Sequence, residues 1–271
     1  PRSYLFVPGD RPERFAKALA SGADAVVLDL EDAVAPAAKA AARAAIGEWL
    51  RGAAAGDVQV LVRLNDVATP WFADDLAMLA GCSAARAGVM LPKAEQASQL
   101  AAVRQVLPEA PVLALVESAA GVANVDAVAA SPGVSRLAFG TLDFALDLGI
   151  DIADDAAGLA YAASRIAIAS RAAGLAAPVA GVTPDLKNEA RLLADFAWAR
   201  RLGFAAKLCI HPAQVAPLHA ALRPGDDELA WARRVLDAVA AQPSGAVQLD
   251  GRMVDRPVVL RAQALLARAG R

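Results

Sequence analysis

The sequence has little cysteine and no marked excess of either charge. Cys82 and Cys209 are the only cysteines among 271 residues, which is too few for a disulfide framework and gives no metal-ligand spacing. Both are expected to be inert, buried thiols. The 29 acidic and 27 basic residues are interspersed, so no surface for nucleic acid or anionic lipid is expected.

A long uncharged apolar run is also missing, although 57% of the residues are hydrophobic. The longest stretch without Asp, Glu, Lys or Arg runs from Leu208 to Leu222 and contains two prolines and two histidines, so it is not expected to cross a bilayer. The sequence begins with a strand-like SYLFV and has neither a basic segment nor a long apolar segment there. No secretion signal is therefore expected, and the expected location is the cytoplasm.

Eight short apolar or β-branched runs alternate with alanine-rich helical stretches, which is typical of βαβ units around a parallel sheet. The runs are residues 3–8, 25–31, 58–64, 87–92, 111–117, 134–139, 177–182 and 205–210. Most are apolar on both faces, as strands are when a barrel interior lies on one side and helices on the other. A doubly wound sheet is the alternative, but VPGDRPERF follows the first run where a Gly-rich phosphate loop would be needed. The pattern predicts an α/β fold, a single (β/α)₈ TIM barrel.

The chain is longer than the barrel requires. We expect the catalytic barrel in residues 1–222 and a C-terminal helical extension with a lid in residues 223–271. Helix-like stretches at about 213–222 and 226–241 are followed by PSGAVQLDGRMVDRP and a last helix. A Gly-containing polar segment between helices is typical of a flap or lid, and an arm for subunit packing is the alternative.

Charged and polar residues follow five neighbouring predicted strands at their C-terminal ends, where barrel enzymes build their sites. They are Asp29 to Asp32 at the end of the second run, Arg63 and Asn65 at the end of the third, Lys93 at the end of the fourth, Glu117 and Ser118 at the end of the fifth, and Asp143 shortly after the sixth. Glu117 and Asp143 could offer carboxylate oxygens to one Mg²⁺, whereas Zn²⁺ would require His or Cys. The structural alternatives are a helix cap for Asp143 and an ion pair with Arg63 for Glu117.

Arg63 has two interpretations at this mouth. Its guanidinium could bind a carboxylate or stabilise a developing enolate oxyanion. Alternatively, it could be only the structural partner of Glu31 and Asp32.

Motifs along nearly the whole chain resemble those of the citrate lyase beta-like enzymes of the HpcH/HpaI aldolase family, which include malyl-CoA and citramalyl-CoA lyases. The motifs are LFVPGDRPERFAKA, VVLDLEDAV, VRLN, LPKAE, LVES, FGTLDFALDLG, KLCIHP and GRMVDRP. The resemblance implies a trimeric or hexameric (β/α)₈ barrel that binds Mg²⁺, with Mn²⁺ as a possible substitute. It also implies a reaction that cleaves or forms a C–C bond in an acyl thioester of CoA.

The resemblance further implies roles for individual residues. Glu117 and Asp143 match the magnesium ligands, and Arg63, together with Glu117, matches the substrate contacts. Glu31 and Asp32 match an acidic pair behind the waters of the metal. Arg11, Arg14 and Lys17 lie where contacts to CoA or a carrier phosphopantetheine are implied, although exposed basic residues at a helix start can equally be only solvated.

Asp255 lies in the segment Gly251 to Pro257, GRMVDRP. In the CoA-dependent members, a similar lid motif supplies an aspartate that covers the site of a neighbouring subunit and exchanges a proton with the acyl carbon. The resemblance therefore favours free CoA thioesters over a carrier-bound citryl group. The alternative is that Asp255 only caps the last helix.

The expected reaction is the Mg²⁺-dependent cleavage of a 3-hydroxyacyl thioester such as malyl-CoA, citramalyl-CoA or citryl-CoA to a 2-oxo acid and an acyl-CoA, or the reverse reaction that forms the thioester. Arg63 is expected to stabilise the enolate and Asp255 to protonate it. Two rivals remain: the citryl-thioester lyase subunit of a carrier-protein complex, and a paralogue that binds metal and ligand without turnover.

Two further sets of residues carry weaker hypotheses. Lys93 or Lys207 could form a Schiff base with a carbonyl substrate, but that mechanism leaves the two carboxylates unexplained. No nucleophile elbow accompanies His211, so a rim or structural position is expected for it.

Overall fold

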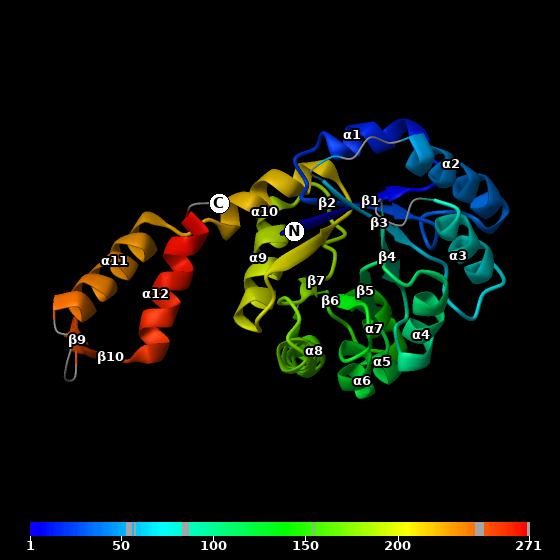
Figure 1. The fold of residues 1–271 in the computed structure, drawn as a ribbon. Coiled ribbons are helices and arrows are strands. Elements are labelled where there is room, and N and C mark those ends of the chain that lie inside the picture. The colour runs from blue at the N-terminus through cyan, green and yellow to red at the C-terminus, as the bar shows by residue number, and fades with distance from the viewer. Residues whose placement is uncertain (53–55, 57, 83–86, 154, 242–246, 270–271) are drawn as a thin grey trace. The chain divides into compact units, whose positions relative to one another are not determined.

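In the computed structural model, the eight predicted strands form one closed parallel barrel with helices outside it (Figure 1). The structure describes residues 1–52, 56, 58–82, 87–153, 155–241 and 247–269. The strands are β1 Ser3–Pro8, β2 Ala25–Asp29, β3 Gln59–Arg63, β4 Gly88–Leu91, β5 Val112–Val116, β6 Val134–Phe139, β7 Val179–Ala180 and β8 Ala206–Cys209. They pair in chain order, and β8 closes the barrel on β1. The TIM-barrel prediction is therefore confirmed.

Helices and short 3₁₀ turns connect the strands. The helices are α1 Phe15–Leu19, α2 Lys39–Gly52, α3 Phe72–Ala80, α4 Ala97–Val106, α5 Ala119–Ala123, α6 Val125–Ala129, α7 Thr141–Leu148, α8 Ala160–Ala172, α9 Glu189–Arg201 and α10 Val215–Leu222. The 3₁₀ turns are η1 Pro12–Arg14, η2 Pro36–Ala38, η3 Ala157–Leu159 and η4 Pro212–Gln214. None of the helices in the described part of the chain combines the length and the apolarity that a bilayer crossing requires.

The barrel interior is filled by side chains that alternate along each strand. Its buried cluster is Tyr4, Ala25, Val27, Leu61, Met90, Leu113, Leu115, Ala138, Val179, Ala206 and Leu208. Because side chains on a strand alternate with period two, this parity directs Asp29 and Arg63 inward, and Glu117 as the continuation of β5. The same parity directs Lys207, between Ala206 and Leu208, outward.

Residues His219–Arg271 form a second compact unit, and Pro1–Leu218 form the first. The second unit contains helix α11 Asp226–Ala241, a hairpin of β9 Val247–Leu249 and β10 Arg252–Val254, and helix α12 Arg256–Ala269. Helices α11 and α12 pack on each other through a small apolar cluster that includes Val235 and Leu265 (Figure 1). A functional division at residue 222 stays a prediction.

The hairpin in this unit was not predicted, although its signal is in the sequence. Asp250 and Gly251 form the two-residue loop between the paired Leu249 and Arg252, with φ values of 50° and 73°. An Asp-Gly loop with two positive φ angles is the favoured connection of a tight hairpin. Arg234 of α11 holds this loop through two hydrogen bonds to the Asp250 carboxylate, 2.9 and 3.1 Å long.

Candidate functional site

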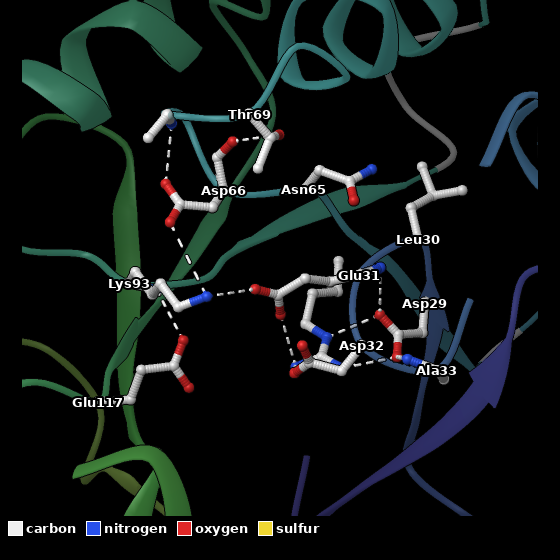
Figure 2. Close-up of polar contacts among 12 residues, drawn as sticks. Asp29, Leu30, Glu31, Asp32, Ala33, Asn65, Asp66, Thr69, Lys93 and Glu117 are labelled. Atoms are coloured by element: carbon white, nitrogen blue, oxygen red, sulfur yellow. Dashed lines mark hydrogen bonds and ion pairs between the residues drawn. The ribbon is translucent and has the colours of Figure 1, made fainter. Parts of the chain in front are cut away.

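The C-terminal mouth of the barrel gathers the charged residues that follow β2 to β6. Asp29 and Arg63 end β2 and β3, Lys93 lies two residues after the end of β4, and Glu117 follows β5 directly. Figure 2 shows Lys93 between Glu31 on one side and Glu117 on the other. Five elements that are distant in the sequence thus meet at one charged mouth, as the strand-end pattern predicted.

Arg63 is buried and faces three carboxylates. Its Nε and Nη2 donate to Asp29 at 2.7 and 2.6 Å, which is a bidentate pair between residues that are also in register across β2 and β3. Its Nη1 donates to Asp32 at 3.2 Å and lies 2.8 Å from Glu31 Oε2. Burial alone would lower the pKa of Arg63, but Asp29, Glu31 and Asp32 raise it above its ordinary value. The structural pairing of Arg63 with Glu31 and Asp32 is therefore present, and Asp29 is a further partner, which the sequence analysis placed at the mouth without giving it a role.

Glu31 is a buried carboxyl with one unsatisfied oxygen. Its Oε1 receives Lys93 Nζ at 3.2 Å (Figure 2), while Oε2 has no hydrogen bond within the described chain, because the Arg63 contact lacks hydrogen-bond geometry. Burial raises the pKa of Glu31 to about 7, against the effect of Arg63. A buried acceptor without a donor is unusual, and a water molecule could supply that donor.

Lys93 connects this acidic group to Glu117 through its backbone. The residue has a φ of 46°, which is rare for a non-glycine residue. Its amide donates to Glu117 Oε1 at 2.8 Å, and its Nζ lies 3.9 Å from Asp66 Oδ2. Lys93 was predicted to lie at the mouth but not to contact Glu31 and Glu117, and Asp66 is a mouth residue that the sequence analysis did not name.

Glu117 is buried, and its pKa is raised well above the ordinary value, first by burial and then by the neighbouring charges of Glu31 and Asp143. Gly140 makes its position possible, since a Cβ atom at Gly140 would overlap the Glu117 side chain. The predicted ion pair between Glu117 and Arg63 is not formed among the described contacts. The Glu117 carboxyl instead accepts one hydrogen bond from the Lys93 amide and lies near the like charges of Glu31 and Asp143.

Asp143 lies in the first turn of α7, immediately after Gly140 brings the chain past Glu117. It is half-buried, and no hydrogen bond or ion pair of its side chain is found among the described residues. It therefore does not make the helix cap considered as its structural alternative, although an acid in the first turn is favourable for a helix.

The donor set at this mouth fits a hard divalent cation. Glu117 and Asp143 are oxygen donors, and a cation beside them would relieve the like-charge repulsion that raises the Glu117 pKa. Within the described residues, no three His, Cys, Asp or Glu side chains enclose a metal by themselves. A cation here would thus keep ligands from water or substrate, as Mg²⁺ commonly does.

The basic residues predicted to contact CoA lie beyond the end of β1. Arg11 immediately precedes η1, Arg14 lies in η1 and Lys17 lies in α1. All three are exposed. Arg11 lies 4.0 Å from the carboxylate of Asp10, and Arg14 lies 3.8 Å from the carboxylate of Glu13. Both are weak surface contacts. Their cofactor role stays a prediction.

Neither lysine of the Schiff-base hypothesis is placed as that chemistry would require. Lys93 is held by Glu31 and Asp66; burial lowers its pKa, but Glu31, Glu117 and Asp66 together raise the pKa above its ordinary value. Lys207 faces away from the barrel interior, and its Nζ donates to the Gly181 carbonyl at 2.7 Å. Burial lowers the pKa of Lys207 to about 8.

Lys207 gives a pH-dependent stability that can be measured. The folded-state pKa lies below the unfolded value, so burial of the ammonium destabilises the fold below pH about 8, and this cost disappears as pH rises toward the unfolded pKa. Methionine at position 207 does not titrate. Raising the pH from 7 to 10 should therefore increase the unfolding free energy of the parent chain by about 2 kcal/mol relative to that of Lys207→Met. Urea titrations at the two pH values measure this shift, and a pH-independent difference would contradict it.

Four other predicted residues have structural contacts. His211 is exposed, and its Nδ1 accepts from the Ala213 amide at 3.2 Å, which agrees with a structural position at the rim. Cys82 and Cys209 are free and buried as predicted, and burial raises the pKa of Cys209 to about 12. Asp255 is exposed and caps α12, because its Oδ1 accepts from the Val258 amide at 3.2 Å. The capping alternative is therefore observed, and the proton-transfer role of Asp255 stays a prediction.

Known proteins are similar to this chain in sequence and fold over nearly its full length. The model of the HpcH/HpaI aldolase/citrate lyase family matches residues 2–212. A citrate lyase subunit beta-like protein of Deinococcus radiodurans is 40% identical over 277 residues, which cover 98% of this chain and 96% of the relative. A (3S)-malyl-CoA thioesterase of Cereibacter sphaeroides is 33% identical over 271 residues, covering 99% and 94%.

A solved structure agrees with these relatives. The crystal structure of protein CitE from Mycobacterium tuberculosis, in complex with magnesium, acetoacetate and coenzyme A, has a TM-score of 0.87 and 39% identity, and the match covers 100% of this chain and 98% of that one. The motifs, the closed barrel and the acidic mouth agree with these matches. The chain belongs to the HpcH/HpaI aldolase/citrate lyase family.

Proposed function

We propose that this chain is a Mg²⁺-dependent carbon–carbon lyase acting on a 3-hydroxyacyl-CoA thioester such as malyl-CoA, citramalyl-CoA or citryl-CoA. The products of cleavage are a 2-oxo acid and an acyl-CoA, and the reverse reaction forms the same bond. The observation that carries the proposal is the pair Glu117 and Asp143 beside Arg63 at one mouth. The magnesium, acetoacetate and coenzyme A in the related CitE structure support the same chemistry.

Each residue at the mouth has a definite task in this proposal. Glu117 and Asp143 hold the cation, and Glu31 Oε2 and Asp32 accept hydrogen bonds from its water ligands. The bound cation supplies Lewis-acid charge beside the substrate hydroxyl. Two hydrogen bonds from Nε and Nη2 of Arg63 to Asp29 fix the plane of its guanidinium at the mouth.

The bond changes balance without a further reactant. The hydroxyl loses its proton to solvent, its oxygen becomes the carbonyl of the 2-oxo acid, and the electrons of the broken C–C bond pass to the thioester as an enolate. Arg63 stabilises the enolate oxygen. Asp255 passes one proton from solvent to the enolate carbon, so no net proton is gained or lost. Arg11, Arg14 and Lys17 bind the CoA part of the substrate, and a trimer or hexamer in the cytoplasm is the proposed assembly.

Hydrolysis is the second candidate activity, because one relative bears the name (3S)-malyl-CoA thioesterase. The same mouth would then direct water to the thioester carbonyl. The products separate the two activities: C–C cleavage of malyl-CoA gives glyoxylate and acetyl-CoA, whereas hydrolysis gives malate and free CoA. Activity only on a citryl group loaded on a carrier protein would indicate a subunit of a larger lyase, and binding without turnover would indicate a non-catalytic paralogue.

The metal dependence is the first test of this proposal. We expect EDTA to abolish the cleavage of malyl-CoA or citramalyl-CoA and Mg²⁺ or Mn²⁺ to restore it, because Glu117 and Asp143 would otherwise face each other uncompensated. Product analysis by mass spectrometry follows both activities in one assay. Borohydride added with substrate is expected to trap no adduct on Lys93 or Lys207. Full activity in excess EDTA, or a trapped lysine adduct, would contradict the mechanism.

A further inference from the structure

A second pocket lies outside the barrel, beside β7 and β8 and the helix α9. It has a volume of about 600 Å³ and is lined largely by apolar side chains, among them Phe139, Leu159, Trp198 and Phe204. Such a volume and lining are typical of sites for small molecules. This pocket is separate from the mouth. The side chains of Glu117 and Arg63 point into the barrel, as the alternation along their strands requires, whereas the side chain of Lys207 points out of it.

Lys207 supplies a buried cation to this pocket. Its side chain is 1% exposed and lines the pocket together with Gly181, whose carbonyl accepts one hydrogen bond from Nζ at 2.7 Å. An ammonium group has three donors. In the described part of the chain, Lys207 has no carboxylate at ion-pair distance and one hydrogen bond from Nζ, so two of its donors can serve a ligand, and Asp195 offsets its charge only from a longer distance.

The other charged groups of the pocket are already satisfied. Arg191 and Asp195 of α9 pair at 2.6 Å, and Thr183 donates to the second oxygen of Asp195 at 2.7 Å. Asp155 and Asp185 are exposed, and each accepts a backbone amide two residues further along the chain, at 2.9 and 3.0 Å. Among the described charged groups of the lining, Lys207 is therefore the buried one without an oppositely charged partner at ion-pair distance, whereas Asp155 and Asp185 are exposed to solvent.

We propose that this pocket binds a small carboxylic acid with an apolar body, whose carboxylate pairs with Lys207 and whose body lies against the Trp198 and Phe204 wall. A carboxylate supplies both the missing acceptors and the opposite charge, and a buried charge is stable only when it is paired and hydrogen-bonded. One lysine offers too few donors for a phosphate dianion, and the neighbouring Asp195 would repel a dianion more strongly than a carboxylate with a single charge. A neutral ligand would leave the ammonium unpaired.

Calorimetry of the full chain with matched probes tests this proposal. The probes are hexanoate and benzoate with their amides, hexanamide and benzamide. EDTA is present near neutral pH so that no metal ion at the mouth can bind a carboxylate. We expect each acid to bind at least about tenfold more tightly than its amide, because a hydrogen bond to a charged group contributes more than a neutral one. Lys207→Met should remove this preference and leave the weak amide binding unchanged.

Two tryptophan substitutions on α9 separate pocket binding from other sites without altering Lys207. Ala194 lines the pocket whereas Ala197 does not, and both are exposed on the same helix. Ala194→Trp should prevent the binding of all probes, and Ala197→Trp should leave binding unchanged. This pair also decides the outcome if Lys207→Met fails to fold.

Three results would overturn the proposal. One is that no acid binds up to its solubility limit, and another is that acids and amides bind equally. The third is acid binding that persists in Ala194→Trp, which would place the probe elsewhere, for example among the cations at the mouth.

Discussion

Replacement of Arg63 by lysine is expected to lower kcat by about 10² to 10³, the usual loss when an oxyanion donor is removed. The charge is retained, but an ammonium cannot reproduce the planar fork. In the parent chain, Nε and Nη2 hold Asp29 at 2.7 and 2.6 Å while Nη1 reaches Asp32 at 3.2 Å. A lysine can satisfy only one direction of this arrangement, so the donor to the enolate is lost or misplaced.

The division between kcat and KM tells how Arg63 acts. A fall in kcat with an equal fall in kcat/KM indicates an interaction made in the transition state, whereas a rise in KM alone would reduce Arg63 to a substrate anchor. Arg165→Lys is the matched control, because Arg165 of α8 makes an exposed ion pair with Asp126 at 2.8 Å, away from the mouth. Its kcat should be unchanged.

The eight strands could be predicted because each is a short apolar run bounded by helical sequence. The predicted bounds differ from the structure by at most two residues at either end, as at β2, which stops at Asp29 before Glu31, and at β7, which is Val179–Ala180 where 177–182 was predicted. In the second unit, the helices were visible in the sequence, but the hairpin was missed because its strands are only three residues each. The Asp250-Gly251 pair was its one strong signal.

The charged mouth could be predicted from strand ends, but its internal pairing could not be predicted from those ends alone. The parity of β2 and β3 could have placed Asp29 beside Arg63, since Ala25, Val27 and Leu61 all face inward. No sequence rule gives the positive φ of Lys93, which sends its amide to Glu117. That conformation is maintained by the tertiary contacts around it.

Asp255→Asn is the second substitution with a large expected effect, about 10² to 10⁴ in kcat, the scale for loss of a general acid or base. Its observed cap on α12 makes the choice of substitution important, because a loss of the cap could be mistaken for a loss of chemistry. Asparagine and serine both cap helices well, whereas alanine does not. Asn and Ser variants should therefore keep the parent stability in urea titration, and Ala should lose about 1 kcal/mol.

Activity should follow a different order from stability if Asp255 transfers a proton. The Asn, Ser and Ala variants should all lose turnover to a similar extent, since none has a carboxyl group, while binding of Mg²⁺ and thioester is retained. If Asp255 acts only as a cap, Asn and Ser should be fully active and only Ala should be impaired. Undiminished turnover in Asp255→Asn would therefore exclude the proton-transfer role.

A mixture of variants tests whether Asp255 serves the mouth of its own barrel or that of a neighbour. Subunits with Asp255→Asn lack the proton donor, and subunits with Glu117→Gln lack a metal ligand, so each parent preparation should be inactive. If the lid acts between subunits, an exchanged oligomer contains some mouths with an intact Glu117 covered by an intact Asp255, and activity should reappear. If the lid acts within one subunit, every mouth in the mixture still lacks one of the two groups. Failure to recover activity, after mass spectrometry has confirmed mixed oligomers, would contradict sharing between subunits.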